Sequence, residues 1–237
     1  FYTMAQEKTI SEGKVQIHAF TGDISKKLPV FYNPHMKNNR EISVLILNAL
    51  DKEELRIALP MAASGIRGIR LLKELNENKI GKIYFNDRSE NSIKQIKDNL
   101  KLNKLQKDDR VVVNQDDANE FLLKEKHFDY IDIDPFGSPN PFLDSAIKRL
   151  RHYGILAVTA TDTAPLCGTY PKACNRKYWS KPIRNHMMHE MGLRILIRKI
   201  QLLGAQFDHA LIPVLAYYER HYFRIFFQMK RDSKKLC

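Results

Sequence analysis

The stretch Leu55-Arg56-Ile57-Ala58-Leu59-Pro60-Met61-Ala62-Ala63-Ser64-Gly65-Ile66-Arg67-Gly68 contains a buried-strand pattern, a glycine-containing loop and the start of a helix. The same order of a short apolar run and a helix-period segment recurs along the chain. Because strands joined through helices pair in parallel, the sequence predicts an α/β fold, a mostly parallel sheet with helices on both faces. The expected strands are 55–59, 82–86, 111–113, 130–133 and 155–158, and the expected helices are 68–76, 90–103, 119–124 and 141–151.

The end of the chain adds a feature that a plain dinucleotide-binding fold does not predict. A basic amphipathic helix is expected at 183–203, followed by two β-rich segments at 210–217 and 222–229. The turn around Glu219-Arg220 is too short for a crossover, so these two segments must form an antiparallel hairpin. Alternating α/β units that end in a hairpin are the outline of a Rossmann-like methyl-transferring domain with seven strands, and they disfavour a nicotinamide dehydrogenase.

The N-terminal part is expected to be a small extension. Alternation of Val15, Ile17 and Ala19 predicts a short strand within 10–20, and 26–39 has the composition of a loop. A helix is expected at 40–50, with one apolar face made of Ile42, Leu45, Ile46 and Ala49. We therefore predict an extension over residues 1–35 and one α/β domain over 36–237.

Composition limits the possible partners and compartments. The 237 residues include 39 Lys+Arg and 27 Asp+Glu, a formal net charge of +12, which favours a polyanionic partner such as nucleic acid. No apolar run approaches the length of a membrane span, and no secretory signal is recognisable. Cys167, Cys174 and Cys237 are an odd number of cysteines without a CxxC pair, which disfavours a disulfide framework and a zinc knuckle. We expect a cytoplasmic protein.

Three loops at the predicted carboxyl ends of strands have residues suited to a ligand, because ligands of open α/β sheets bind at that edge. In the first, Gly65 and Gly68 let backbone approach a ligand before a helix start with free N–H groups. In the second, Asp87 can accept both ribose hydroxyls of an adenosyl group. In the third, Asp117 can take an adenine amino group while the next backbone N–H meets a ring nitrogen. A structural turn and two helix N-caps are the alternatives.

The most informative segment is Asp132-Ile133-Asp134-Pro135-Phe136-Gly137-Ser138-Pro139, after the fourth predicted strand. An exocyclic base amine is a poor nucleophile because its lone pair is delocalised into the ring. The Asp134 carboxylate and the Pro135 carbonyl can each accept one of its N–H groups, which favours a lone pair directed at an incoming methyl group. Phe136 can stack on the base while the prolines keep the turn rigid. A Pro-rich turn with a capping Asp is the structural alternative.

These motifs resemble the tRNA (guanine-N2)-dimethyltransferase family, which uses S-adenosylmethionine to make N2,N2-dimethylguanosine at position 26 of tRNA. The resemblance covers residues 30–229. It is carried by Val30-Phe31-Tyr32-Asn33-Pro34, Asn39-Arg40, Ser64-Gly65-Ile66-Arg67-Gly68-Ile69-Arg70, Asp117-Ala118-Asn119, Asp134-Pro135-Phe136-Gly137-Ser138-Pro139, Thr159-Ala160-Thr161-Asp162-Thr163-Ala164-Pro165-Leu166-Cys167-Gly168 and Ala216-Tyr217-Tyr218.

The resemblance implies a Rossmann-like class I methyltransferase fold and a role for each matching position. Arg40 and Arg67 would meet the methionine carboxylate of the cofactor, Asp87 the ribose, and Asp117 with Ala118 the adenine. Asp134 would be the catalytic acceptor, with Phe31 and Phe136 flanking the flipped guanine. By residue pattern alone, Arg40 reads as a solvated helix residue, and only the resemblance gives it a role.

Two departures from the family pattern accompany the resemblance. Leu59-Pro60-Met61 stands where the family's first loop begins with an acid, which puts one polar contact to the cofactor in doubt. The family also has a C-terminal domain beyond the methyltransferase core, whereas this sequence stops at Cys237. Either the molecule is truncated or its partner surface is unusual, and we expect weak tRNA affinity rather than absent chemistry. We expect a monomer.

A basic segment with interleaved aromatic residues is the candidate tRNA-binding surface. It is expected to be a loop over 170–184 that contacts phosphates and unpaired bases, and a solvated loop is its alternative. Its cations are Lys172, Arg176, Lys177, Lys181 and Arg184, and Arg194, Arg198 and Lys199 on the next helix extend it. His186 and His189, three apart on that helix, lack a third ligand, so no metal is expected.

The sequence therefore predicts a transferase that methylates the exocyclic N2 of guanosine 26 in tRNA. An N-methyltransferase for another exocyclic amine, such as adenine N6 of RNA or DNA, is an alternative, because the Asp134 chemistry serves any such group. A non-catalytic RNA-binding protein on the same fold is a second alternative. It would bind tRNA with steep salt dependence but would not bind S-adenosylmethionine.

Overall fold

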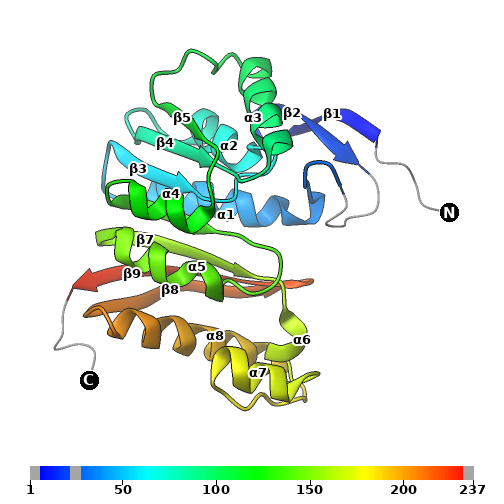
Figure 1. Cartoon of the computed structure of the whole chain (residues 1–237), viewed down its shortest axis with the longest axis vertical. Coiled ribbons are helices and arrows are strands. Elements are labelled where there is room, and N and C mark those ends of the chain that lie inside the picture. Colours follow the sequence, from blue (N-terminus) through cyan, green and yellow to red (C-terminus); the bar gives the residue numbers. More distant parts are fainter. Residues whose placement is uncertain (1–5, 22–27, 232–237) are drawn as a thin grey trace. The chain divides into compact units, whose positions relative to one another are not determined.

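The computed structural model describes residues 6–21 and 28–231 of the chain (Figure 1). It comprises two compact units, unit 1 at Phe1–Lys124 and unit 2 at Glu125–Cys237. The N-terminal strands belong to unit 1. The predicted division into an extension over residues 1–35 and an α/β domain over 36–237 stays a prediction. None of the described helices is long and apolar enough to span a membrane. Cys237 lies outside the described residues.

Unit 1 contains three parallel strands in the order β5-β4-β3. The strands are β3 (Leu55–Leu59), β4 (Ile80–Asn86) and β5 (Val111–Asn114), paired in register at Ile57↔Ile83 and Tyr84↔Val112. The helices that follow them are α2 (Ile66–Glu74), α3 (Glu90–Leu102) and α4 (Ala118–Lys124). The three strands and three helices predicted between residues 55 and 124 are all present, with ends shifted by no more than two residues.

Helix α3 shows why local sequence was informative here. The Ser89 hydroxyl accepts a hydrogen bond from the Ser92 N–H at 3.4 Å, so Ser89 is the N-cap that the sequence predicts. Ile93, Ile96 and Leu100 recur at helical spacing and are all buried.

Helix α1 (Lys37–Ala49), which follows the short 3-10 helix η1 (Pro34–Met36), corrects the sequence prediction. The apolar face expected at Ile42, Leu45, Ile46 and Ala49 is not the buried one, and the Leu45 side chain is 66% exposed. The buried residues of α1 are Asn39, Arg40, Ser43, Val44 and Leu47. Arg40 and Ser43 can lie on the inner face because they form hydrogen bonds there, Arg40 with Glu12 and Ser43 with Arg67.

The N-terminal part is an antiparallel hairpin of β1 (Gln6–Glu12) and β2 (Val15–Thr21). The sequence predicted only one of these strands. Two asparagine side chains, Asn99 on α3 and Asn103 at its C-cap, pair with the backbone of β2 as a neighbouring strand would. Asn99 Oδ1 accepts from the His18 N–H at 2.7 Å, and Asn103 Oδ1 accepts from the Gln16 N–H at 3.1 Å.

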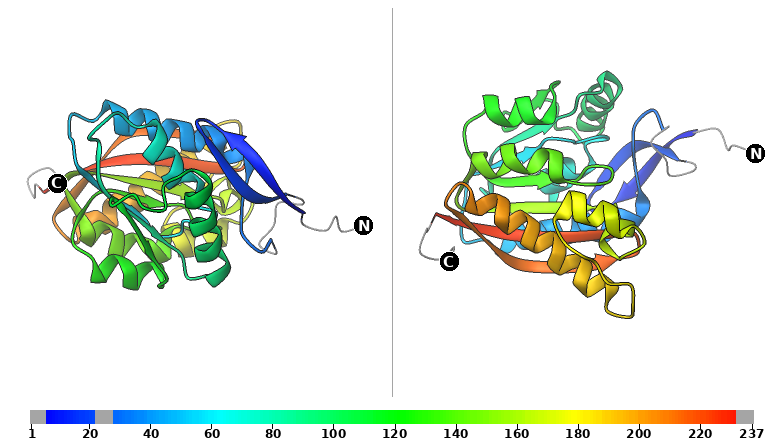
Figure 2. Two further views of the ribbon diagram at one scale, coloured as in Figure 1. Left: turned by 90° about the horizontal axis from the view of Figure 1, so that it is seen from above. Right: turned by 60° about the horizontal axis from the view of Figure 1, so that its bottom comes forward.

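Unit 2 contains four strands in the order β6-β7-β9-β8. β6 (Phe128–Ile133) and β7 (Leu150–Ala160) are parallel, and β8 (His209–Glu219) and β9 (Tyr222–Arg231) form the predicted antiparallel hairpin. β9 also pairs antiparallel with β7. The helices are α5 (Asn140–Arg149), α6 (Thr163–Leu166), α7 (Pro171–Tyr178) and α8 (Met188–Ala205), and α8 lies along β8 (Figure 2).

The C-terminal helices differ from the prediction in two places. α8 begins at Met188 rather than at residue 183, because the Asn185 side chain accepts from the Met187 N–H at 2.9 Å and forms a turn there. His186 therefore precedes the helix, and the two histidines do not share one helical face. The segment predicted as a basic loop contains helix α7, which begins with Pro171 in its first turn.

Candidate functional site

The loop after β3 reaches helix α2 through a backbone conformation that glycine favours. Gly65 has φ +78° and is the N-cap of α2. A Cβ on Gly68 would lie 2.3 Å from the Phe85 ring and 2.7 Å from Leu59 Cδ1. Gly68 is therefore needed for the packing of α2 on the strands. The close approach of backbone to a ligand, expected at Gly65 and Gly68, stays a prediction.

The carboxyl ends of β3, β4 and β5 are hydrogen bonded to one another. Asn86, fully buried, donates through Nδ2 to the carbonyls of Pro60 at 3.0 Å and Asp116 at 3.1 Å. Its Oδ1 accepts from the Asp116 N–H at 3.1 Å. One amide side chain thus fixes the three candidate ligand loops of unit 1. The sequence placed Asn86 at this edge but gave no signal for this bridging role.

Asp87 lies next to the glycine loop, as the sequence predicts. Its Oδ2 accepts from the Ala63 N–H at 2.9 Å, and its Oδ1 accepts from the Ser89 N–H at 3.0 Å. A carboxylate oxygen has more than one lone pair, so both oxygens keep acceptor capacity for hydroxyl groups.

Asp117 and Ala118 begin helix α4. Asp117 Oδ1 accepts from the backbone N–H groups of Asn119 at 2.8 Å and Glu120 at 3.4 Å. The capping role that the sequence left open for Asp117 is therefore present, through one of its two oxygens. Ala118 is buried at the start of the helix.

Arg40 lies on the polar inner face of α1, and Arg67 reaches that face from α2. The Arg67 Nη1 donates to the Ser43 hydroxyl at 2.9 Å, and that hydroxyl donates to the Asn39 carbonyl at 3.0 Å. Arg40 is only 5% exposed, so it is not the solvated helix residue that its sequence context suggests. Phe31 is half-buried in the segment that leads to η1.

In unit 2, Asp134 follows the last residue of the fully buried strand β6. Asp134 is half-buried, Pro135 is buried, and the Phe136 side chain is 45% exposed. Gly137 has φ +81°, donates its N–H to the Thr161 hydroxyl at 2.7 Å and accepts from the Thr161 N–H at 3.0 Å. The loop that presents Asp134 is therefore a fixed turn with an aromatic side chain at its surface.

Helix α7 supports that turn through contacts that the sequence analysis missed. The Tyr178 hydroxyl lies 2.6 Å from Asp162 Oδ1 and 3.0 Å from the Ser138 hydroxyl. Burial, together with the nearby Asp162 carboxylate, raises the pKa of Tyr178 well above its usual range. Asn140 donates through Nδ2 to the Lys177 carbonyl at 2.8 Å. Short, separate motifs in the sequence gave no signal of these contacts.

The candidate tRNA-binding cations are exposed, and they include Lys172, Arg176, Lys177, Lys181 and Arg184. Lys177 pairs with Asp162 at 3.1 Å. Lys199, predicted to extend this surface, is instead buried, with its Nζ 2.8 Å from the centre of the Trp179 ring. Burial lowers the pKa of Lys199.

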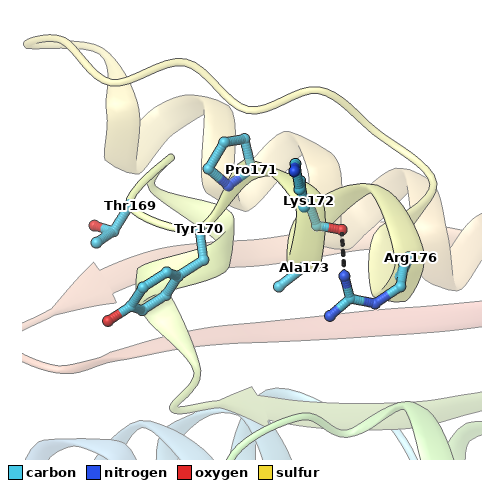
Figure 3. Close-up of a pocket in the computed structure, with 6 residues that line it drawn as sticks. All are labelled: Thr169, Tyr170, Pro171, Lys172, Ala173 and Arg176. Carbon is cyan, nitrogen blue, oxygen red and sulfur yellow. Dashed lines mark hydrogen bonds between the residues drawn. The ribbon is translucent and has the colours of Figure 1, made fainter.

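An open depression of about 410 Å³ lies at the first turn of α7 (Figure 3). It is lined by Thr169, Tyr170, Pro171, Lys172, Ala173 and Arg176. The Tyr170 side chain is 60% exposed, and the Arg176 Nη1 donates to the Lys172 carbonyl at 3.4 Å. An aromatic face beside two cations is an arrangement that suits an unpaired base and its phosphates.

Within residues 6–21 and 28–231, no three His, Cys, Asp or Glu side chains are grouped so that they could hold a metal ion. His189 stacks on Tyr218, with ring centres 3.9 Å apart. Cys167 and Cys174 are buried free thiols, and burial raises the pKa of both.

The chain is similar to known tRNA-modifying enzymes over nearly its whole length. It is 45% identical over 234 residues to the tRNA (guanine(26)-N(2)/guanine(27)-N(2))-dimethyltransferase of Aquifex aeolicus, covering 96% of this chain and 59% of that protein. It is 43% identical over 241 residues to the tRNA (guanine(26)-N(2))-dimethyltransferase of Pyrococcus abyssi, covering 95% of this chain and 62% of that protein. The chain thus spans about three fifths of the length of these relatives.

The chain is also similar to solved structures of tRNA-modifying enzymes. The structure of Trm1 from Pyrococcus horikoshii with S-adenosyl-L-methionine has a TM-score of 0.85 and 39% identity, covering 97% of this chain and 63% of that chain. Trm5b from Pyrococcus abyssi, with a TM-score of 0.65 and 17% identity, shares the fold alone. The predicted Rossmann-like class I methyltransferase fold is confirmed. The family model for N2,N2-dimethylguanosine tRNA methyltransferases matches residues 6–236, and the chain belongs to this family.

Proposed function

We propose that this chain is a tRNA (guanine-N2)-dimethyltransferase that uses S-adenosylmethionine to methylate the exocyclic N2 of guanosine 26, giving N2-methyl- and N2,N2-dimethylguanosine. Family membership supports the reaction class. The observation that carries the proposal is the fixed turn after β6, which presents a half-buried Asp134 beside an exposed Phe136.

The polar groups of unit 1 fit S-adenosylmethionine. Asp87 keeps acceptor capacity for the ribose hydroxyls, and Asp117 has one oxygen outside its capping bonds for the adenine amino group. The backbone N–H of Ala118 would donate to an adenine ring nitrogen, and Gly65 would let the backbone approach the cofactor closely. Arg40 and Arg67 would supply positive charge for the methionine carboxylate. When bound, S-adenosylmethionine supplies a methyl group on a positively charged sulfur, and the C–S bond breaks as the N–C bond forms.

The residues of unit 2 are proposed to prepare the amine. The Asp134 carboxylate and the Pro135 carbonyl each accept one N–H of guanine N2, which localises its lone pair. Asp134 then accepts the proton that N2 loses as it gains the methyl group. Phe136 and Phe31 stack on the guanine ring, and a second turnover adds the second methyl group.

The exposed cations Lys172, Arg176, Lys177, Lys181 and Arg184 are proposed to bind tRNA phosphates, with Tyr170 stacking on an unpaired base. Affinity for tRNA should therefore fall steeply as salt concentration rises. We further propose that the protein acts as a monomer in the cytoplasm, and size-exclusion chromatography with light scattering tests the monomer.

The test of the proposed reaction is Asp134→Ala, assayed with tRNA transcript and labelled S-adenosylmethionine. The variant should bind the cofactor as the wild type does but methylate about 100-fold or more slowly, because the amine loses its acceptor. Asp144→Ala, which removes an exposed carboxylate on α5, is the control and should retain full activity. Methylation by Asp134→Ala close to the wild-type rate would contradict the proposal.

Identification of the modified nucleoside tests the substrate separately. N2-methyl- and N2,N2-dimethylguanosine are expected, and both should be absent from a tRNA with adenosine at position 26. A methylated adenosine would instead support the alternative amine, and tRNA binding without cofactor binding would support a non-catalytic protein.

A further inference from the structure

Glu12, the last residue of β1, is a buried carboxylate that accepts hydrogen bonds from three residues of unit 1. It is 4% exposed and accepts from Arg40 Nε at 2.7 Å, Arg40 Nη2 at 2.6 Å and Arg70 Nη1 at 2.8 Å. The Tyr32 hydroxyl donates to its Oε2 at 3.1 Å. The Glu12 carboxylate at the end of β1 thus places a negative charge against the inner face of helix α1.

The electrostatics of this cluster keep the carboxylate ionised. Burial alone would raise the pKa of Glu12, but the hydrogen bonds and charges of Arg40 and Arg70 outweigh it and lower that pKa below its usual value. Burial and the Glu12 charge raise the pKa of Tyr32 to about 12, so Tyr32 remains a hydrogen-bond donor at neutral pH.

The contacts of Arg40 leave one side of its guanidinium for another partner. Its three hydrogen bonds use Nε and Nη2, two to Glu12 and one from Nη2 to the Asn33 carbonyl at 3.1 Å. None of them uses Nη1. Because the guanidinium is planar, a paired carboxylate on one edge fixes the direction of the remaining N–H donors.

We propose that Glu12 is a positioning residue of the cofactor site, which holds the Arg40 guanidinium so that its Nη1 binds the carboxylate of S-adenosylmethionine. This inference rests on the proposed function. The N-terminal hairpin of β1 and β2 would then contribute directly to the geometry of the S-adenosylmethionine site.

A second contact links the same hairpin to the cofactor loop. Asn99 Nδ2 donates to the carbonyl of His18 in β2 at 3.2 Å and to the carbonyl of Ser64 at 2.9 Å. Ser64 directly precedes Gly65, so the hairpin is tied to two of the residues of unit 1 that are proposed to meet the cofactor, Arg40 directly and Gly65 through its neighbour.

The experiment measures the binding of two ligands to the full chain by calorimetry. S-adenosylmethionine has the amino-acid carboxylate, whereas 5′-methylthioadenosine keeps the adenosine part and lacks that carboxylate. In Glu12→Gln the Kd for S-adenosylmethionine should rise about tenfold, because Gln cannot accept both Arg40 hydrogen bonds. The Kd for 5′-methylthioadenosine should remain within about twofold of the wild-type value.

Two further variants separate positioning from general damage. Glu74→Gln removes a carboxylate that accepts from Arg70 Nε and Nη2, both at 2.8 Å, without contacting Arg40, and it should leave both Kd values unchanged. In an Arg40→Ala background, Glu12→Gln should have no added effect on the S-adenosylmethionine Kd.

The outcomes that overturn the inference are distinct from a failure of the proposed function. Equal weakening of both ligands in Glu12→Gln would indicate structural damage only. Tighter binding of S-adenosylmethionine would show that Glu12 merely offsets the Arg40 charge. Additive effects of the two substitutions would show that Glu12 does not act through Arg40. A wild-type chain that binds neither ligand would instead contradict the proposed function.

Discussion

Two buried arginine clusters, one in each unit, are built on different plans. In unit 2, Arg224 is fully buried and donates to both Asp132 oxygens, at 2.8 Å and 2.7 Å, and to the Thr159 hydroxyl at 3.0 Å. In unit 1, the Glu12 carboxylate is shared between Arg40 and Arg70. The first cluster joins strands β6, β7 and β9, whereas the second joins a hairpin to two helices.

The difference indicates what each cluster can do. Burial alone would lower the pKa of Arg224, but the Asp132 charge and hydrogen bonds hold it above its usual range, so Arg224 stays charged. This pair joins three strands and ends on β6 just before Asp134. The shared carboxylate of unit 1 instead leaves Arg40 Nη1 outside its hydrogen bonds, which suits a site that receives an anion.

The largest expected effect is on the free energy of unfolding. Its absence would contradict the difference drawn between the Arg224 cluster and the Glu12 cluster. Arg224→Met should lower the free energy of unfolding by about 3–5 kcal/mol, because Asp132 would remain buried without its cation. Arg40→Met should lower it by only about 1–3 kcal/mol, because Glu12 keeps Arg70 as a partner. Urea unfolding followed by circular dichroism measures both, and equal losses would contradict the distinction.

An intermediate effect is expected at the glycines that shape the two ligand loops. Gly65→Ala should cost about 1–3 kcal/mol, since alanine resists the positive φ and its Cβ would meet Ile96 Cγ1 at 3.2 Å. Gly137→Ala has a similar φ but no atom within 4 Å of the new Cβ, so it should cost only about 1 kcal/mol. Thermal unfolding of both variants tests this order, and a greater loss at Gly137 would reverse it.

The smallest expected effect concerns acid pH. Because the pKa of Glu12 is lower in the folded chain than its ordinary value of 4.5, its ionisation stabilises the fold above that value. This contribution is lost as pH falls through the lower, folded pKa. The stability difference between wild type and Glu12→Gln should therefore shrink from pH 6 toward pH 3. Urea unfolding at several pH values measures it, and a constant difference would show that Glu12 ionisation is not involved.

Elements with local signals could be predicted from the sequence. The strands of the parallel core, the Ser89 cap of α3 and the closing hairpin follow from apolar runs, capping residues and a short turn. β1 has a weaker apolar pattern and was missed, since its pairing with β2 is what makes it a strand. The face of α1 was misassigned because Arg40 and Ser43 are buried by partners far away in the sequence.

The candidate site shows the same limit. Asp87, Asp117 and Asp134 could be named because the ends of successive parallel strands place ligand residues at one edge of a sheet. The Asn86 bridge and the contact of Tyr178 with Asp162 and Ser138 could not, because each joins segments with unrelated local patterns. Lys199 was assigned to the surface because a cation on an amphipathic helix usually lies there, but Trp179 covers it.

By itself the sequence determined the α/β class, the closing hairpin, the family resemblance and the residue types at each strand end, since these depend on periodicity and local motifs. Only the tertiary structure decided which charges are paired, which loops are fixed and which helix face is buried. The physical reason is that a buried charge is stable only beside its partner, and the partners of Arg40 and Arg224 lie 28 and 92 residues away.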